Sequence, residues 1–279
     1  MTPGVLRSHL YVPADQERLL SKARSRGADA LIIDLEDAVV PSRKDIALAA
    51  ALEFLAEPVE GPERWVRVNG GERGLADIDA IAPLSPDGVW LPKAEPGEWF
   101  TEAHRRVTEA GLRLGILVES AAGIVGMPQL PPLREDTLAQ LGEVDLAANL
   151  RMRDTSDEAM VPYRARIVME TAMRGLAPAV APVDVRVDDP EGFRARSTSL
   201  RDRGFGSRAC IHPDQVAIAN SVFEVDAADV ELARATILEF EQHEAEGRGA
   251  FRTASGGMAD LATIRWARDV IARADEVGL

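Results

Sequence analysis

The chain has 279 residues, of which 46% are hydrophobic and 28% charged, as in ordinary globular proteins. Its 46 acidic and 32 basic residues give a formal charge of −14, which disfavours nucleic acids and anionic membranes as partners. The single cysteine, Cys210, excludes an internal disulfide. Because there is no secretory leader and no apolar run of about 18 residues, we expect a cytoplasmic protein.

Eight short apolar segments alternate along the chain with longer segments of helical character. The predicted strands are SHLYVP from Ser8, ALIIDLE from Ala30, RWVRVN from Arg64, GVWLPKA from Gly88, RLGILVES from Arg113, LAQLGEVD from Leu138, APAVAPVDV from Ala177 and SRACIHP from Ser207. Most are continuous apolar runs, which are typical of strands covered on both faces. Strand–helix alternation repeated eight times predicts an α/β fold, a (β/α)8 TIM barrel, with an open doubly wound sheet as the alternative.

The chain continues well beyond the eighth predicted strand. We therefore expect one domain, with the barrel over residues 1–221 and a C-terminal helical extension over residues 222–279. The extension is predicted to hold a helix from Ala227 to about Glu246, a glycine-rich loop from Gly247, and a final helix from about Ala262 to Ala274. A loop of this kind is often a mobile lid over a site, and the alternative is a plain connection.

Polar side chains close six of the predicted strands. They are Asp34, Glu36 and Asp37 on the second strand, Arg67 and Asn69 on the third, Lys93 on the fourth, Glu119 on the fifth, Asp145 on the sixth and His212 on the eighth. In a parallel barrel these strand ends converge on one face, where the active sites of this fold lie. The pattern predicts a polar site at that face rather than strands that merely reach solvent.

Glu119 and Asp145 are the candidate metal ligands, because they end adjacent predicted strands and would project into the same mouth. Two carboxylates with no His or Cys nearby suit a hard cation such as Mg²⁺, which also binds water and substrate oxygens. The alternative is that the two acids form ion pairs with Arg67 or Lys93.

Arg67 is a candidate for binding a substrate carboxylate, because a guanidinium can donate two parallel hydrogen bonds and stays charged. The alternative is that it pairs with a neighbouring acid. Glu36 and Asp37 are placed to hold the water ligands of a metal, although Asp37 would also suit a helix cap. His212 precedes a proline, which favours a structural role in a turn.

Motifs along nearly the whole chain, in order, resemble those of the citrate lyase β-subunit family. This family belongs to the HpcH/HpaI aldolase superfamily and includes malyl-CoA and citramalyl-CoA lyases. The segments that carry the resemblance are RSHLYVPAD, LIIDLEDAV, VRVNG, GVWLPKAE, LVESAAGI, the Gly142–Asp145 pair of GEVDLA, CIHPDQ, GRGAF and GGMAD.

The resemblance implies a magnesium-dependent enzyme that cleaves or forms a carbon–carbon bond beside an acyl thioester and releases or consumes a 2-oxo acid. It implies that Glu119 and Asp145 bind the metal, that Arg67 binds the oxo acid, and that Glu36 and Asp37 lie around the metal's waters. It also implies a homotrimer in which Asp260, on the lid, reaches the active site of a neighbouring subunit and donates a proton. The candidate catalytic residues are thus Arg67, Glu36, Asp37 and Asp260, and the candidate substrate-binding residues are Arg67, Glu119, Lys22 and Lys93.

The chain departs from the family pattern on the thioester side. The departures are Gln16 and Glu17 in place of Arg-Pro, Val180 and Ala181 where an Asp is usual, Arg151 in place of a Gly, and Ala262 in place of a Pro. Lys22 matches a basic residue that contacts phosphate, so coenzyme A and an acyl-carrier protein both remain possible carriers. Three other functions stay open: a thioester hydrolase or Claisen synthase, an aldolase of free 2-oxo acids, and a non-catalytic binding subunit.

Overall fold

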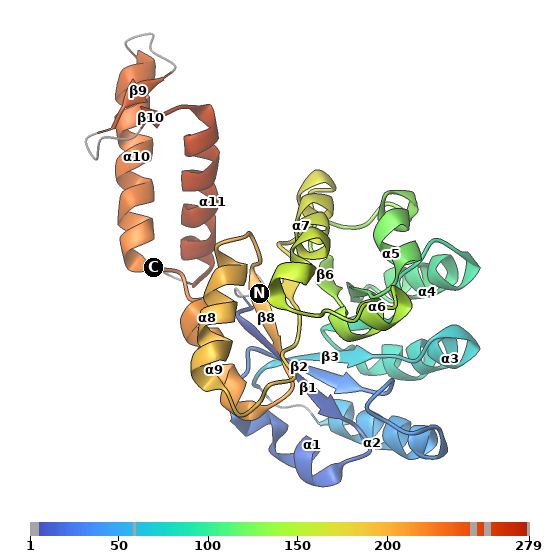
Figure 1. Ribbon diagram of the computed structural model, residues 1–279. Coiled ribbons are helices and arrows are strands. Elements are labelled where there is room, and N and C mark those ends of the chain that lie inside the picture. Colours follow the sequence, from blue (N-terminus) through green and yellow to red (C-terminus); the bar gives the residue numbers. More distant parts are fainter. Residues whose placement is uncertain (1–5, 58–59, 246–249, 254–257, 278–279) are drawn as a thin grey trace. The chain divides into compact units, whose positions relative to one another are not determined.

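The computed structural model describes residues 6–57, 60–245, 250–253 and 258–277. The chain forms two compact units (Figure 1), one spanning Arg7–Phe223 and the other Glu224–Leu279 together with the residues before Arg7. Within the described residues, no helix combines the length and the apolar character that crossing a membrane requires.

Eight parallel strands close into a barrel within Arg7–Phe223, each pairing with the next and β8 pairing with β1 (Figure 1). The strands are β1 (Ser8–Pro13), β2 (Ala30–Asp34), β3 (Glu63–Arg67), β4 (Gly88–Leu91), β5 (Arg113–Val118), β6 (Leu138–Leu141), β7 (Val180–Ala181) and β8 (Ser207–Cys210). Each of the eight predicted segments contributes one strand. The predicted (β/α)8 barrel is therefore confirmed, and the open sheet is excluded.

Helices connect successive strands around the barrel. They are α1 (Glu17–Ala23), α2 (Lys44–Ala56), α3 (Gly71–Ile81), α4 (Glu98–Glu109), α5 (Ala121–Gly126), α6 (Glu143–Asn149), α7 (Asp157–Met173), α8 (Pro190–Arg201) and α9 (Pro213–Val222), with the 3-10 turns η1 (Arg24–Arg26), η2 (Pro41–Arg43), η3 (Ala82–Leu84) and η4 (Met127–Gln129). His212 is the N-cap of α9, where its side chain accepts a hydrogen bond from the Asp214 N–H. This is the structural role expected for His212.

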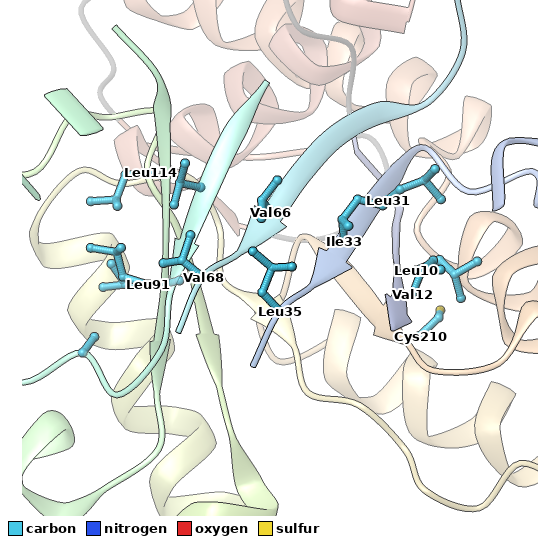
Figure 2. Close-up of a cluster of buried hydrophobic side chains, with 14 of the residues drawn as sticks. Leu10, Val12, Leu31, Ile33, Leu35, Val66, Val68, Leu91, Leu114 and Cys210 are labelled. Carbon is cyan, nitrogen blue, oxygen red and sulfur yellow. The ribbon is translucent and has the colours of Figure 1, made fainter. Parts of the chain in front are cut away.

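The outward-facing side chains of the strands form the main hydrophobic core. Leu10, Val12, Leu31, Ile33 and Val66 project from β1, β2 and β3 and are at most 3% exposed (Figure 2). They alternate with side chains that face the barrel interior, because successive residues of a strand point to opposite sides. Burying each such side chain contributes about 1.5–3 kcal/mol, which explains why the strands read as apolar runs.

Two tryptophans fill the interior of the barrel beside two glycines. A Cβ on Gly88 would lie 2.2 Å from the ring of Trp65, and a Cβ on Gly115 would lie 2.4 Å from the ring of Trp90. The glycines therefore provide the space that the indoles occupy. His9 packs edge-on against Trp90, and its Nε2 lies 3.0 Å from the Ser207 hydroxyl.

Acid is expected to destabilise the barrel through His9. Burial lowers the pKa of this imidazole from 6.5 to about 4, with Arg113 lowering it further and Asp29 opposing. Between these pH values the unfolded chain binds a proton that the folded chain excludes, so stability should fall by about 3 kcal/mol as pH drops through that range. The measurement is the free energy of urea unfolding at about pH 7 and about pH 4.5.

The control for this prediction is His9→Gln, which is neutral at both pH values and should lose less stability in acid than the parent. If both proteins lose the same amount, His9 is not responsible. Proton NMR of the His9 ring provides a second measurement, because the ring should remain neutral down to about pH 4 in the native protein.

The described residues of the C-terminal unit form α10 (Ala227–Ala245), β9 (Phe251–Arg252), β10 (Met258–Ala259) and α11 (Leu261–Val277). β9 and β10 pair antiparallel, and Phe240 of α10 is buried with Ala259 and Ile264. Both predicted helices are therefore present. Most of the predicted glycine-rich loop, residues 247–249 and 254–257, lies outside the described residues.

Candidate active site

A cavity of about 230 Å³ opens at the carboxyl ends of the barrel strands. Its walls come from the ends of β1, β2, β3, β5 and β6, from the start of α6, and from the segments after β7 and β8. The lining residues are Tyr11, Pro13, Asp34, Ala38, Arg67, Leu117, Glu119, Gln140, Gly142, Glu143, Val144, Asp145, Val183 and Ile211. Three of the predicted site residues, Arg67, Glu119 and Asp145, are thus brought together in one cavity.

Arg67 is held by two carboxylates from the end of β2. Its Nε and Nη2 donate to the two oxygens of Asp34 at 2.8 and 2.5 Å, and its Nη1 lies 3.1 Å from Oε2 of Glu36. Asp34 is fixed in turn by the backbone N–H of Glu36 at 2.8 Å. Burial lowers the pKa of Arg67, but the pairing with Asp34 and Glu36 outweighs burial and raises it. Of the five N–H donors of a guanidinium, at least two remain for a ligand.

Glu36 connects Arg67 to Lys93. Its Oε1 accepts from the Lys93 ammonium at 2.9 Å, and this bond raises the pKa of Lys93. Burial raises the pKa of Glu36 itself, against the effect of Arg67 and Lys93. Lys93 adopts a left-handed backbone with φ of 49°, and its N–H donates to Oε1 of Glu119 at 2.7 Å. Lys93 therefore contacts two of the predicted acids.

Glu119 is a buried acid of the cavity that, unlike Asp34, lacks a cationic side-chain partner in the described part of the chain. It is 3% exposed, and its Oε2 has no hydrogen-bond partner among the described residues. Burial raises its pKa to about 8, and the negative charges of Glu36 and Asp145 raise it as well. A carboxylate oxygen left without a donor beside a second acid is a position that a cation would stabilise.

Asp145 lies in the first turn of α6, and not at the end of a strand as predicted. β6 ends at Leu141, and Gly142 is the N-cap of α6, which begins at Glu143. No group of three or more His, Cys, Asp or Glu able to hold a metal occurs in the described part of the chain. Glu119 and Asp145 still fit Mg²⁺, which typically takes one or two carboxylates and completes its shell with water and substrate oxygens.

Gly142 makes the space that the Glu119 carboxylate occupies, and Gly142→Ala should displace it. An added Cβ would lie 2.6 Å from Cβ and 2.8 Å from Oε2 of Glu119, while the φ of −86° permits alanine. We expect the affinity for magnesium, measured by the rise in melting temperature across a magnesium titration, to fall at least about tenfold. The free energy of unfolding without magnesium should fall by about 1–3 kcal/mol. Gly70→Ala is the matched control, because a Cβ there meets nothing within 4 Å at a φ of −79°. Equal magnesium responses in the two variants would contradict the prediction.

The remaining predicted residues are not among those that line the cavity. Asp37 is exposed, and its N–H donates to Oε2 of Glu36 at 3.2 Å. Lys22 is exposed in the last turn of α1. Asp260 belongs to the C-terminal unit, where its Oδ1 accepts from the Thr263 N–H at the start of α11 at 3.2 Å.

The sequence interpretation missed two residues that form the floor of the cavity. Tyr11 of β1 donates from its hydroxyl to Oε1 of Gln140 on β6 at 3.1 Å. The Arg67 guanidinium lies 5.0 Å from the centre of the Tyr11 ring. The alternation of β1 was the available signal, because His9 and Tyr11 share the parity that faces the barrel interior.

Comparison with known proteins shows that most of the chain matches one protein family. Residues 7–213 match the HpcH/HpaI aldolase/citrate lyase family. A (3S)-malyl-CoA thioesterase of Cereibacter sphaeroides is 34% identical over 276 residues, covering 97% of this chain and 95% of the relative. A mitochondrial citramalyl-CoA lyase of Mus musculus is 27% identical, covering 97% of this chain and 86% of the relative.

A solved structure matches over nearly the full length. The protein CitE from Mycobacterium tuberculosis, in complex with magnesium, acetoacetate and coenzyme A, has a TM-score of 0.77 and 26% identity. The match covers 98% of this chain and 99% of that protein.

Proposed function

The chain belongs to the HpcH/HpaI aldolase/citrate lyase family, and we propose that it is a magnesium-dependent carbon–carbon lyase. Its substrate is a 3-hydroxyacyl thioester with a carboxylate on C3, and its products are a 2-oxo acid and a shorter acyl thioester. The observation that supports this most directly is the unpaired, buried Oε2 of Glu119 in a cavity shared with Asp145 and Arg67. The family relationship to lyases and the magnesium in a similar structure agree with it.

We assign metal binding and oxo acid binding to different residues around the cavity. Glu119 and Asp145 would hold the cation, and we assign to Glu36 and Asp37 the role of orienting its waters. When bound, Mg²⁺ supplies positive charge that stabilises the oxygen at the breaking bond. Arg67 uses the N–H donors that Asp34 and Glu36 leave available to bind the oxo acid fragment.

In the cleavage direction the 3-hydroxyl group passes its proton to water and becomes the carbonyl of the 2-oxo acid. The bond between C2 and C3 breaks, and its electron pair passes to the thioester fragment as an enolate. That enolate needs a proton on carbon, and we assign the donor role to Asp260 of a neighbouring subunit in a trimer. Lys93 keeps Glu36 and Glu119 in place through its ammonium and its backbone N–H.

A thioester hydrolase is the second candidate, because a (3S)-malyl-CoA thioesterase is 34% identical to this chain. The same cavity would bind the same acyl group, with water attacking the thioester carbonyl. The carrier is either coenzyme A or an acyl-carrier protein. Exposed Lys22 on α1 is the residue that we propose for a carrier phosphate, and Gln16 and Glu17 reduce the positive charge around it.

The test is a product assay on a panel of 3-hydroxyacyl-CoA compounds with magnesium present. We expect a 2-oxo acid to form in an amount equal to that of the shorter acyl-CoA, which is acetyl-CoA or propionyl-CoA. No free thiol should appear. Free thiol with an intact hydroxy acid would identify a hydrolase instead. Cleavage of free hydroxy acids alone would indicate an aldolase that uses no thioester, and magnesium-dependent binding with no product would indicate a binding subunit.

A further inference from the structure

The floor of the cavity, formed by Tyr11 and Gln140, is polar. Tyr11 reaches from β1 to Gln140 on β6, and Gln140 is only 2% exposed. Both side chains line the same cavity as Glu119 and Arg67. A packed barrel interior is ordinarily filled by branched apolar side chains, so a hydrogen-bonded Tyr–Gln pair at this level requires an explanation.

The Tyr11 phenol fixes which way the Gln140 amide points. Burial raises the pKa of Tyr11, so the phenol keeps its proton and acts as a donor at neutral pH. Oε1 of Gln140 accepts a hydrogen bond from the Tyr11 hydroxyl at 3.1 Å, so the amide nitrogen points away from Tyr11. The ring itself is held by the Arg67 guanidinium, which is bound to Asp34.

The Gln140 amide nitrogen has no protein acceptor among the described residues, and it is not one of the fully enclosed polar atoms. It is therefore a free N–H donor on the cavity wall. Arg67 and Lys93 both pair with Glu36, and Glu143 pairs with Arg164. Of these groups, only Arg67 is assigned to the oxo acid, through the N–H donors that its partners leave available. Gln140 thus adds a neutral hydrogen-bond donor to the cavity, beside the charged donors of Arg67.

We propose that Gln140 is a specificity-determining residue, whose amide donates a hydrogen bond to an oxygen on the part of the 2-oxo acid that reaches the cavity floor. Tyr11 is its positioning residue. An aliphatic group at this point would leave the amide unpaired, and a site built to pair with an oxygen rejects analogues that lack it. The site therefore selects 2-oxo acids that carry a hydroxyl or carboxylate substituent over aliphatic ones. This inference rests on the proposed function.

The experiment is calorimetric titration, with magnesium present, of oxaloacetate, hydroxypyruvate, pyruvate and 2-oxobutyrate. The parent is expected to bind one of the two oxygen-bearing acids at least about tenfold more tightly than the two aliphatic acids. Oxaloacetate and hydroxypyruvate distinguish a carboxylate from a hydroxyl as the group that meets Gln140.

Gln140→Met keeps the volume of the side chain and removes both N–H donors. It should lose at least about tenfold of the preference, through weaker binding of the oxygen-bearing acid and unchanged or tighter binding of the aliphatic acids. Tyr11→Phe should also reduce the preference for the oxygen-bearing acid, but by less. This variant tests the proposal if Gln140→Met does not fold. Tyr163→Phe, on α7 and outside the cavity lining, is the matched control that should preserve the preference.

Two other outcomes are distinct from each other. If both cavity variants bind the acids with the preference of the parent, the role of Gln140 is wrong and the proposed lyase function stands. If the parent binds none of the acids with magnesium, the proposed function is wrong and the inference is overturned with it.

Discussion

Replacement of Glu119 by Ala is expected to remove both the magnesium-dependent rise in melting temperature and the turnover of every thioester substrate. Oε2 of Glu119 has no partner among the described residues, and burial, together with the negative charges of Glu36 and Asp145, raises the pKa of Glu119. A cation between Glu119 and Asp145 would pair with the free oxygen of Glu119 and would offset the repulsion between the two negative charges. Ligand at a hundred times its dissociation constant stabilises the native state by about 2.7 kcal/mol, so its loss is readily measured by differential scanning fluorimetry across a magnesium titration.

Asp145→Ala should have the same effect, because two carboxylates are the whole of the proposed protein contribution to the site. Glu109→Ala is the matched control, since Glu109 is an exposed acid at the end of α4. It should keep the full magnesium response. An undiminished response in Glu119→Ala would show that the metal, if it binds, is held elsewhere.

The barrel was predictable because its strands are buried on both faces. Segments such as Ala30–Asp34 are fully buried and therefore read as continuous apolar runs. Gln140 and Gly142 both interrupt the apolar run of the sixth segment. Gln140 lies within β6, and Gly142 marks the point where β6 gives way to α6. Asp145 consequently reaches the cavity from the first turn of a helix, although its presence in the site was expected.

The pairing within the site could not be read from the chain. Arg67 was expected to bind a substrate carboxylate or a neighbouring acid, and the structure gives it Asp34 and Glu36 as partners. Such pairs join residues more than thirty positions apart, so only the closed barrel places them in contact. The same holds for Tyr11 and Gln140, which are 129 positions apart. Strand alternation indicates which side chains face inward, but not which of them meet.

Asp260→Asn is expected to lower kcat strongly while leaving folding, magnesium binding and oxo acid binding unchanged. Oδ1 of Asp260 accepts from the Thr263 N–H at the start of α11, so an alanine would also remove a helix cap. Asparagine caps a helix as well as aspartate does, but it has no acidic proton to deliver to the enolate. General acid catalysis contributes about 10²–10⁴-fold, and the expected loss of kcat is of that size.

Hybrid oligomers test whether Asp260 acts on a neighbouring subunit. In a trimer, Asp260→Asn subunits retain an intact barrel, and Arg67→Ala subunits retain an intact Asp260. If the two variants are unfolded together, mixed in equal amounts and refolded, about a quarter of the sites should pair an intact barrel with an intact Asp260 from the next subunit. Activity should therefore return in the mixture, although each variant alone is inactive. Light scattering on the parent gives the independent check, because a fully active monomer would exclude a site shared between subunits.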